Sequence, residues 1–267
     1  MNRISTADGT RLFVRDWGSG QPIVFLSGWT LSSDAWGYQM TPLSERFRCI
    51  AIDRRSHGRS DDPGRGYDYD TLADDLAAVL DALDLTGVTL VAHSFGGGEA
   101  VRYLTRHGTR RVKRLLLLAP AGLPCRRQLD GNEGVPDEMI GQLVDTIGHD
   151  FPGWIEANAL PYFMPDTPRA VIDWTARDMT RTSLLATVAL TRLQMTTDFR
   201  AELARLDVPT LVIHGDADES APIDLTGRPV AAMVPGAQLV VYEGAPHGLY
   251  FTHQRRLNED IARFAGC

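Results

Sequence analysis

The sequence has few cysteines and almost no lysine. The three cysteines, Cys49, Cys125 and Cys267, stand far apart, in no spacing typical of a metal site. A chain of 267 residues buries enough surface to fold without disulfide bonds. We therefore expect free thiols and a reducing compartment. Lys113 is the only lysine, so arginine supplies nearly all of the positive charge.

Basic patches and long apolar runs are also missing. The formal net charge of −7 argues against nucleic acid and anionic membranes as partners. The longest strongly apolar stretch, residues 115–123, is too short to span a bilayer. The first ten residues lack the apolar core of a signal peptide. We therefore expect a cytoplasmic protein, and nothing in the sequence indicates its oligomeric state.

What the sequence does contain is an alternation of short apolar runs with helical patterns. A hairpin is predicted near the N-terminus, with its turn at Asp8 and Gly9. Later apolar runs begin at Pro22, Phe47, Val88, Arg114, Pro209 and Gln238. Nearly continuous apolar runs are typical of strands buried on both faces, as in a parallel sheet. Residues 70–85 and 253–266 show the apolar spacing of one helix face. The sequence thus predicts an α/β fold with a mostly parallel, doubly wound sheet and an N-terminal antiparallel hairpin.

One long segment breaks this alternation. Residues 124–206 contain no good strand pattern and instead carry helical patterns with aromatic residues and prolines. We predict a core domain of residues 1–123 and 207–267, with residues 124–206 as a helical cap insertion. Such an insertion would lie over the carboxyl ends of the strands, where open α/β sheets bind their ligands.

A serine stands where the third buried run should turn into a helix. The stretch from Val91 reads VAHSFGGG, so Ser94 has an apolar strand before it and three glycines after Phe95. This is a G-x-S-x-G pattern with Ala92 in place of the first glycine, and it is typical of a nucleophile elbow. The alternative is that the serine only caps a helix.

An acid and a histidine follow in the order that such a serine needs. Asp218 comes after the run that begins at Pro209, and His247 comes after the run that begins at Gln238. Because the carboxyl ends of parallel strands meet at one sheet edge, Ser94, Asp218 and His247 are predicted to form a catalytic triad. Asp216 and Glu219 are rival candidates for the acid, and we favour Asp218.

At this point the chain resembles the α/β-hydrolase family over essentially its full length. In its motifs it is most similar to the bacterial cofactor-free haloperoxidases and aryl esterases. The resemblance rests on the stretches DWGSGQPIVFLSGW, IAIDRRSHGRSD, VAHSFGGG, VPTLVIHGDAD and APHG.

The resemblance implies a role for each of these site residues. Ser94 would be the nucleophile, His247 the general base and then acid, and Asp218 the group that orients the imidazole. The backbone N–H groups of Trp29 and Phe95 would form an oxyanion hole. No metal and no organic cofactor are implied. Serine at the nucleophile position excludes the aspartate-based mechanism of haloalkane dehalogenases and epoxide hydrolases of this fold.

Two residues of the oxyanion loop depart from the family pattern. Ser27 stands where the family usually has histidine, and this changes how the loop is braced. Thr30 stands where perhydrolase members carry proline, so the sequence favours plain ester hydrolysis over peroxide-dependent chemistry.

For function, the main hypothesis is a serine hydrolase that acts on a small carboxylic ester or lactone. Thr30, Trp154 and Phe163 are the candidate residues of the substrate pocket. The aromatic residues of the cap are equally interpretable as its core. The alternatives are a carbon–carbon bond or amide hydrolase on the same triad, and a ligand-binding protein with slow turnover.

Overall fold

A single eight-stranded sheet forms the centre of the molecule. The computed structural model describes residues 3–129 and 134–266, and its strand order is β1-β2-β4-β3-β5-β6-β7-β8. Strands β1 (Arg3–Ser5) and β2 (Arg11–Trp17) pair as an antiparallel hairpin, and β2 is also antiparallel to β4. All other neighbours in the sheet are parallel. The predicted α/β fold with its N-terminal hairpin is confirmed.

The parallel strands coincide with the apolar runs in the sequence. They are β3 (Pro22–Leu26), β4 (Arg48–Ile52), β5 (Val88–His93), β6 (Val112–Leu118), β7 (Thr210–Gly215) and β8 (Gln238–Tyr242). Every residue of β5 and β7 is buried, whereas β8 at the edge is partly exposed. These inner strands are apolar on both faces because helices cover both faces.

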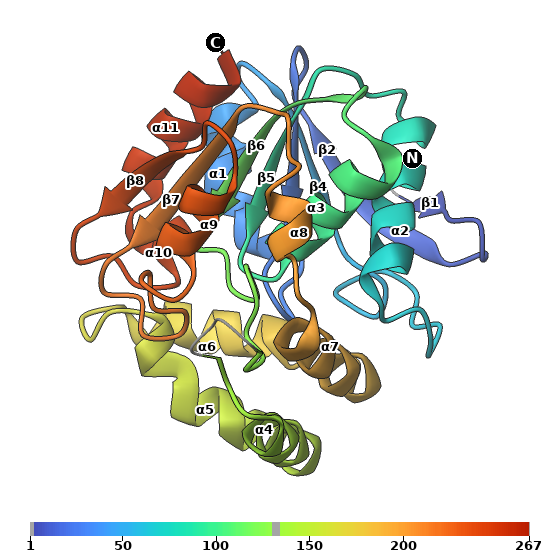
Figure 1. Ribbon diagram of the computed structural model, residues 1–267. Helices are drawn as coiled ribbons and strands as arrows, with labels where there is room; N and C mark the ends of the chain where they lie inside the picture. The colour runs from blue at the N-terminus through green and yellow to red at the C-terminus, as the bar shows by residue number, and fades with distance from the viewer. Residues whose placement is uncertain (1–2, 130–133, 267) are drawn as a thin grey trace.

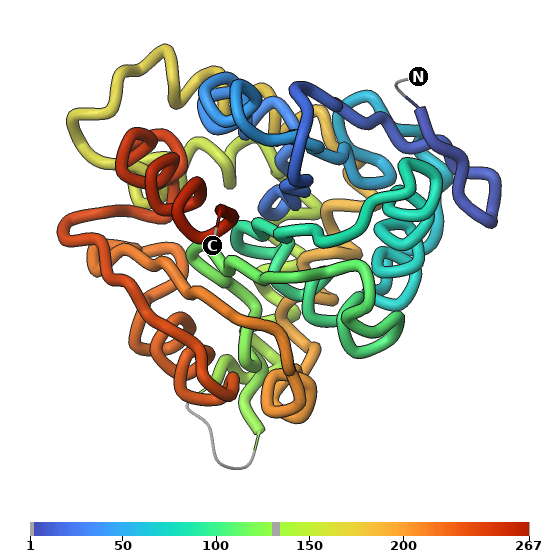
Figure 2. Tube along the Cα trace, turned by 90° about the horizontal axis from the view of Figure 1, so that it is seen from above, coloured from blue at the N-terminus to red at the C-terminus, as the bar shows by residue number. Residues whose placement is uncertain are grey.

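Two groups of helices cover the sheet (Figure 1 and Figure 2). On one face lie α2 (Tyr69–Ala82), α3 (Gly96–His107), α8 (Arg200–Leu203) and α9 (Gly227–Met233). On the other lie the 3-10 helix η1 (Ser33–Trp36), α1 (Gly37–Leu43), α10 (Leu249–Thr252) and α11 (Gln254–Gly266). Alternate residues of β3 serve the two cores: Val24 and Leu26 face one, and Ile23 and Phe25 face the other.

Four further helices lie between β6 and β7 in the chain. They are α4 (Asp137–His149), α5 (Phe151–Tyr162), α6 (Arg169–Met179) and α7 (Leu184–Thr196). Figure 1 shows them together below one end of the sheet. Within the described part of 124–206, isolated bridges occur but no strand. The segment is therefore helical, as predicted.

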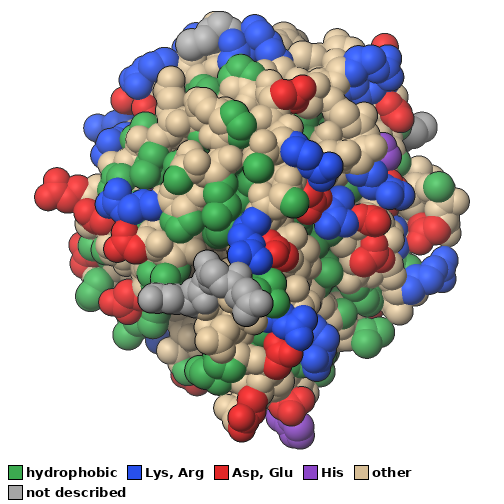
Figure 3. Space-filling model, viewed as in Figure 1, with side chains coloured by type: hydrophobic (Ala, Val, Ile, Leu, Met, Phe, Trp, Pro, Cys, Tyr) green, Lys and Arg blue, Asp and Glu red, His purple; other side chains and the backbone are tan. Residues whose placement is uncertain are grey.

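The surface carries charges of both signs, and two of the cysteines are free thiols. On the face shown in Figure 3, acidic and basic side chains are interspersed. Cys49 and Cys125 are buried free thiols, and Cys267 lies outside the described residues. None of the helices in the described ranges is long and apolar enough to cross a bilayer.

The turn from β5 into α3 is unusually tight. Ser94 adopts a φ of 53°, in the left-handed region that non-glycine residues rarely enter. Its N–H donates to the carbonyl of Leu118 at 2.9 Å, which fixes the turn to the neighbouring strand β6. A Cβ atom on Gly96 would lie 2.8 Å from the carbonyl oxygen of Leu26. Glycine at this position therefore lets α3 begin directly against the end of β3.

Alanine substitutions at Gly96 and Gly97 should separate this close approach from general effects on the helix. A Cβ on Gly97 would meet only side-chain carbons, the nearest at 3.3 Å. We expect Gly96→Ala to lower the free energy of unfolding by about 1–3 kcal/mol, because the added methyl group forces the backbone at Leu26 or Gly96 to move. Gly97→Ala should cost less than about 1 kcal/mol, since alanine also favours the helix. Denaturant unfolding measures both, and equal losses would contradict this explanation of Gly96.

Candidate active site

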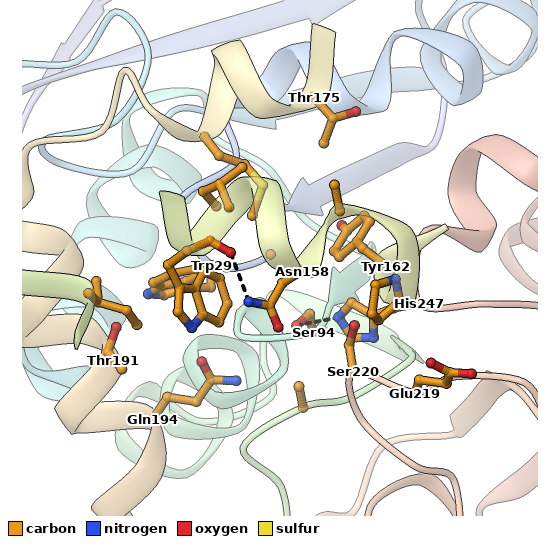
Figure 4. Close-up of a pocket in the computed structure, with 18 of the residues that line it drawn as sticks. Trp29, Ser94, Asn158, Tyr162, Thr175, Thr191, Gln194, Glu219, Ser220 and His247 are labelled. Atoms are coloured by element: carbon orange, nitrogen blue, oxygen red, sulfur yellow. Dashed lines mark hydrogen bonds between the residues drawn. The ribbon is translucent and has the colours of Figure 1, made fainter. Parts of the chain in front are cut away.

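The structure brings Ser94, His247 and Asp218 together. Nε2 of His247 lies 2.9 Å from Oγ of Ser94, and its Nδ1 lies 2.7 Å from Oδ2 of Asp218. The three residues follow β5, β8 and β7, so the parallel sheet places them at one edge. Figure 4 shows His247 hydrogen-bonded to Ser94. All three are buried. The hydrogen bonds form the chain hydroxyl–imidazole–carboxylate that activates a serine nucleophile.

The surroundings of Asp218 keep its carboxylate ionised. Oδ1 accepts a hydrogen bond from the N–H of Ala221 at 2.7 Å, and Oδ2 accepts from His247. Burial alone would raise the pKa of Asp218, but His247 and His214 together hold it well below its ordinary value. An ionised Asp218 fixes the proton of His247 on Nδ1 and leaves Nε2 free to accept the proton of Ser94.

His214 is a second histidine on the same carboxylate, and sequence reasoning missed it. Its Nε2 lies 3.1 Å from Oδ2 of Asp218 and 2.9 Å from the carbonyl of Ala221. The side chain is fully buried at the end of β7. The one sequence signal was its position four residues before Asp218. His214 therefore helps to hold the carboxylate of Asp218 in place.

A third buried histidine, His93, lies beside the triad without joining it. Its ring centroid is 4.9 Å from that of His247, and its Nε2 donates to the backbone carbonyl of His247 at 3.2 Å. Burial, followed by the nearby charge of His247, lowers the pKa of His93 well below its ordinary value. A neutral His93 thus anchors the loop that carries His247.

The two other candidates for the acid of the triad, Asp216 and Glu219, are not hydrogen-bonded to His247. Asp216 is exposed, and its carboxylate accepts from the N–H of Gly244 at 2.6 Å. Glu219 is also exposed and lies at the rim of the cavity described below. Of these three acids, only Asp218 is hydrogen-bonded to His247.

Two backbone N–H groups lie close to Ser94. Phe95 follows Ser94 in the tight turn, and Trp29 follows Gly28, where an added Cβ would lie 3.3 Å from the Cβ of Ser94. Among the described residues, neither Trp29 nor Phe95 donates its backbone N–H to a backbone carbonyl. Both donors are therefore available to a negatively charged oxygen, which is what an oxyanion hole requires.

Arg54 ties these two donors together, and it too was missed. The guanidinium pairs with Glu99 of α3, donates to the carbonyl of Ser27 at 2.9 Å, and lies 4.7 Å from the centroid of the Phe95 ring. Arg54 and Glu99 are both buried. The sequence shows several arginines after β4 but gives no sign of which one turns inward.

The oxyanion loop is braced by its own side chains. The hydroxyl of Ser27 donates to the carbonyl of Ser32 at 2.9 Å, which closes the loop. Thr30 has a φ of 60°, is fully buried, and donates its hydroxyl to the carbonyl of Trp29. Thr30, a candidate pocket residue, is not among the residues that line the cavity beside Ser94.

A cavity of about 280 Å³ opens at Ser94 and His247. Its walls come from the oxyanion loop and from the helices α4–α7, and are mostly apolar. Trp154 and Phe163, the other two candidate pocket residues, both line it. Trp154 also packs edge-on against Trp29, with ring centroids 5.2 Å apart. Tyr162 packs against the imidazole of His247 at 5.2 Å. The aromatic residues thus serve both as cap core and as cavity wall.

Comparison with known proteins agrees with the fold. Residues 23–260 match the model of the alpha/beta hydrolase family. The chain is 40% identical to the non-heme chloroperoxidase CPO-A1 of Kitasatospora aureofaciens, over 97% of this chain and 98% of that one. It is 34% identical to the bifunctional esterase/perhydrolase DCH of Acinetobacter calcoaceticus, over 99% of both. An esterase structure from Exiguobacterium antarcticum superposes with a TM-score of 0.95 at 31% identity, covering 100% of this chain and 99% of that one. The chain belongs to the alpha/beta hydrolase family.

Proposed function

We propose that the protein is a serine hydrolase that cleaves small carboxylic esters or lactones. The observation that carries the proposal is the hydrogen-bonded chain from Ser94 through His247 to Asp218, at the base of a largely apolar cavity. Two relatives, the Acinetobacter esterase/perhydrolase and the Exiguobacterium esterase, bear names that fit this activity.

In the first half of the reaction, Oγ of Ser94 attacks the carbonyl carbon and its proton passes to Nε2 of His247. The negative charge that develops on the carbonyl oxygen is stabilised by the N–H groups of Trp29 and Phe95. Asp218 stabilises the imidazolium. The carbon–oxygen bond of the ester then breaks, and the leaving alkoxide takes the proton from His247.

The second half releases the acyl group from Ser94. Water attacks the acyl carbon and gives a proton to His247, and the same two N–H groups stabilise the oxyanion. When the bond to Ser94 breaks, His247 returns the proton to Oγ and the carboxylic acid leaves. Removing one oxyanion donor typically raises such a barrier by about 3 kcal/mol.

The conformation of Thr30 supports water rather than peroxide as the second substrate. Its φ of 60° lies outside the range near −65° to which proline is restricted. The oxyanion loop thus has a different backbone from a loop with proline at this position, as in the perhydrolases that the sequence resembles. This favours simple hydrolysis as the main activity.

Replacing Ser94 tests the nucleophile. We expect Ser94→Ala to lower kcat for 4-nitrophenyl butanoate by about 10⁴-fold or more, because no covalent intermediate can form. Ser220→Ala removes another hydroxyl that lines the cavity, and should lower kcat by less than about tenfold. Steady-state kinetics with purified variants gives both values. Comparable losses in the two variants would count against Ser94 as the nucleophile.

Asparagine substitutions distinguish Asp218 from its nearest rival. Asp218→Asn should lower kcat by about 10⁴-fold, since an amide no longer holds the proton of His247 on Nδ1. Asp216→Asn keeps an oxygen that can accept from Gly244, so kcat should stay within about threefold of the wild-type value. The same assay measures both variants, with circular dichroism to establish that they fold. A large loss in Asp216→Asn alone would overturn the assignment of the acid.

A further inference from the structure

One cation in the cavity wall, Arg126, has no side-chain partner among the residues that the structure describes. The side chain of Arg126 lines the same cavity as Ser94 and His247, and it is partly buried. Neither a hydrogen bond nor an ion pair joins its guanidinium to another described residue. The contrast with Arg54, Arg55 and Arg59 is clear, since each of those pairs with a carboxylate.

Two acids of this site, Asp218 and Glu219, are engaged with other groups or turn elsewhere. Asp218 uses both oxygens, Oδ1 with Ala221 and Oδ2 with His247 and His214. No ion pair connects Arg126 with either Asp218 or Glu219. Figure 4 shows the carboxylate of Glu219 directed away from Ser94. Arg126 therefore does not serve to neutralise a neighbouring acid.

Arg126 is a cation without a carboxylate partner in a mostly apolar cavity wall. Burial lowers the pKa of Arg126, which the negative charge of Asp218 partly opposes. Guanidinium groups still remain protonated in proteins. Their planar N–H groups match the two oxygens of a carboxylate. The rest of the wall is mostly apolar, so the natural partner of Arg126 is an anionic group of the bound molecule.

The size and charge of the cavity narrow the class of that molecule. At about 280 Å³ it is at the small end for ligand pockets, so one small molecule that fills it touches both Ser94 and Arg126. A single arginine matches one negative charge. A doubly charged phosphate would leave charge uncompensated beside Glu219.

We propose that Arg126 binds a free carboxylate on the substrate, so that the preferred substrates are small esters or lactones that also carry a carboxylate group. This proposal rests on the proposed hydrolase function and adds the substrate class to it.

The test compares matched esters with and without the charge. Mono-4-nitrophenyl glutarate against 4-nitrophenyl pentanoate places the carboxylate on the acyl side. A second pair, 4-carboxyphenyl butanoate against 4-carbamoylphenyl butanoate, places it on the alcohol side. In wild type we expect a preference in kcat/KM for the charged member of at least one pair. Arg126→Leu should lower that preference by about 10- to 100-fold, the value of a charge-assisted hydrogen bond.

Two further variants separate charge from shape. Arg126→Lys keeps the positive charge but loses the planar N–H groups of the guanidinium. It should therefore keep part of the preference for the charged ester. Arg192→Leu removes an exposed arginine of α7 that does not line the cavity, and should leave the preference as in wild type. Binding is read separately from turnover by titrating monomethyl glutarate into Ser94→Ala and into the double variant with Arg126→Leu. The double variant should bind at least tenfold more weakly.

Labelling with a fluorophosphonate distinguishes a failure of the inference about Arg126 from a failure of the hydrolase proposal. If Ser94 is labelled and neutral esters are hydrolysed, but neither pair shows a preference that depends on Arg126, the inference about the carboxylate is wrong and the hydrolase proposal stands. If both members of each pair lose activity equally in Arg126→Leu, Arg126 is structural and the inference is again wrong. If Ser94 is not labelled, the hydrolase proposal itself fails.

Discussion

The left-handed backbone of Ser94 is the constraint on which the rest of the site depends. Holding a serine at a φ of 53° costs on the order of 1–3 kcal/mol, which the surrounding structure must supply. The turn lifts the hydroxyl above the carboxyl edge of the sheet and starts α3 against the end of β3. That is possible only because Gly96 has no side chain to meet the carbonyl of Leu26.

The same turn sets the position of the oxyanion loop, which follows β3. Arg54 is bonded to this loop through Ser27 and to α3 through Glu99, so the two backbone donors are held by one buried ion pair. Removing one partner of a buried pair leaves an uncompensated charge and typically costs about 3–5 kcal/mol. Arg54 therefore serves stability and donor placement together.

The cap helices are fixed to these same loops. Asp178 of α6 accepts from both the N–H and the hydroxyl of Ser32, at 2.9 and 2.6 Å. The carbonyl of Tyr162, at the end of α5, accepts from the N–H of Gly248, next to His247. Thr182 donates to the carbonyl of Thr30 at 2.8 Å. These hydrogen bonds fix the walls of the cavity relative to the groups proposed to perform the chemistry.

Much of this arrangement could be predicted from the sequence, because position after a buried strand is visible in the chain. The apolar runs predicted the strands, and the order of Ser94, Asp218 and His247 predicted which side chains would meet at the sheet edge. The inward turn of Arg54, the second histidine on Asp218 and the unpaired Arg126 were not predictable. Each depends on which side of a loop faces the interior, and a single sequence does not show this. For the same reason the sequence does not show that Thr30 lies outside the cavity lining.

Activation of Ser94 by His247 and Asp218 can be tested with one labelling experiment. Wild type and His247→Ala would be treated with a fluorophosphonate, digested, and mapped by mass spectrometry. We expect a single adduct in wild type, on the peptide that contains Ser94, and labelling slower by orders of magnitude in His247→Ala. An adduct on a different residue, or equal labelling rates in the two proteins, would contradict it.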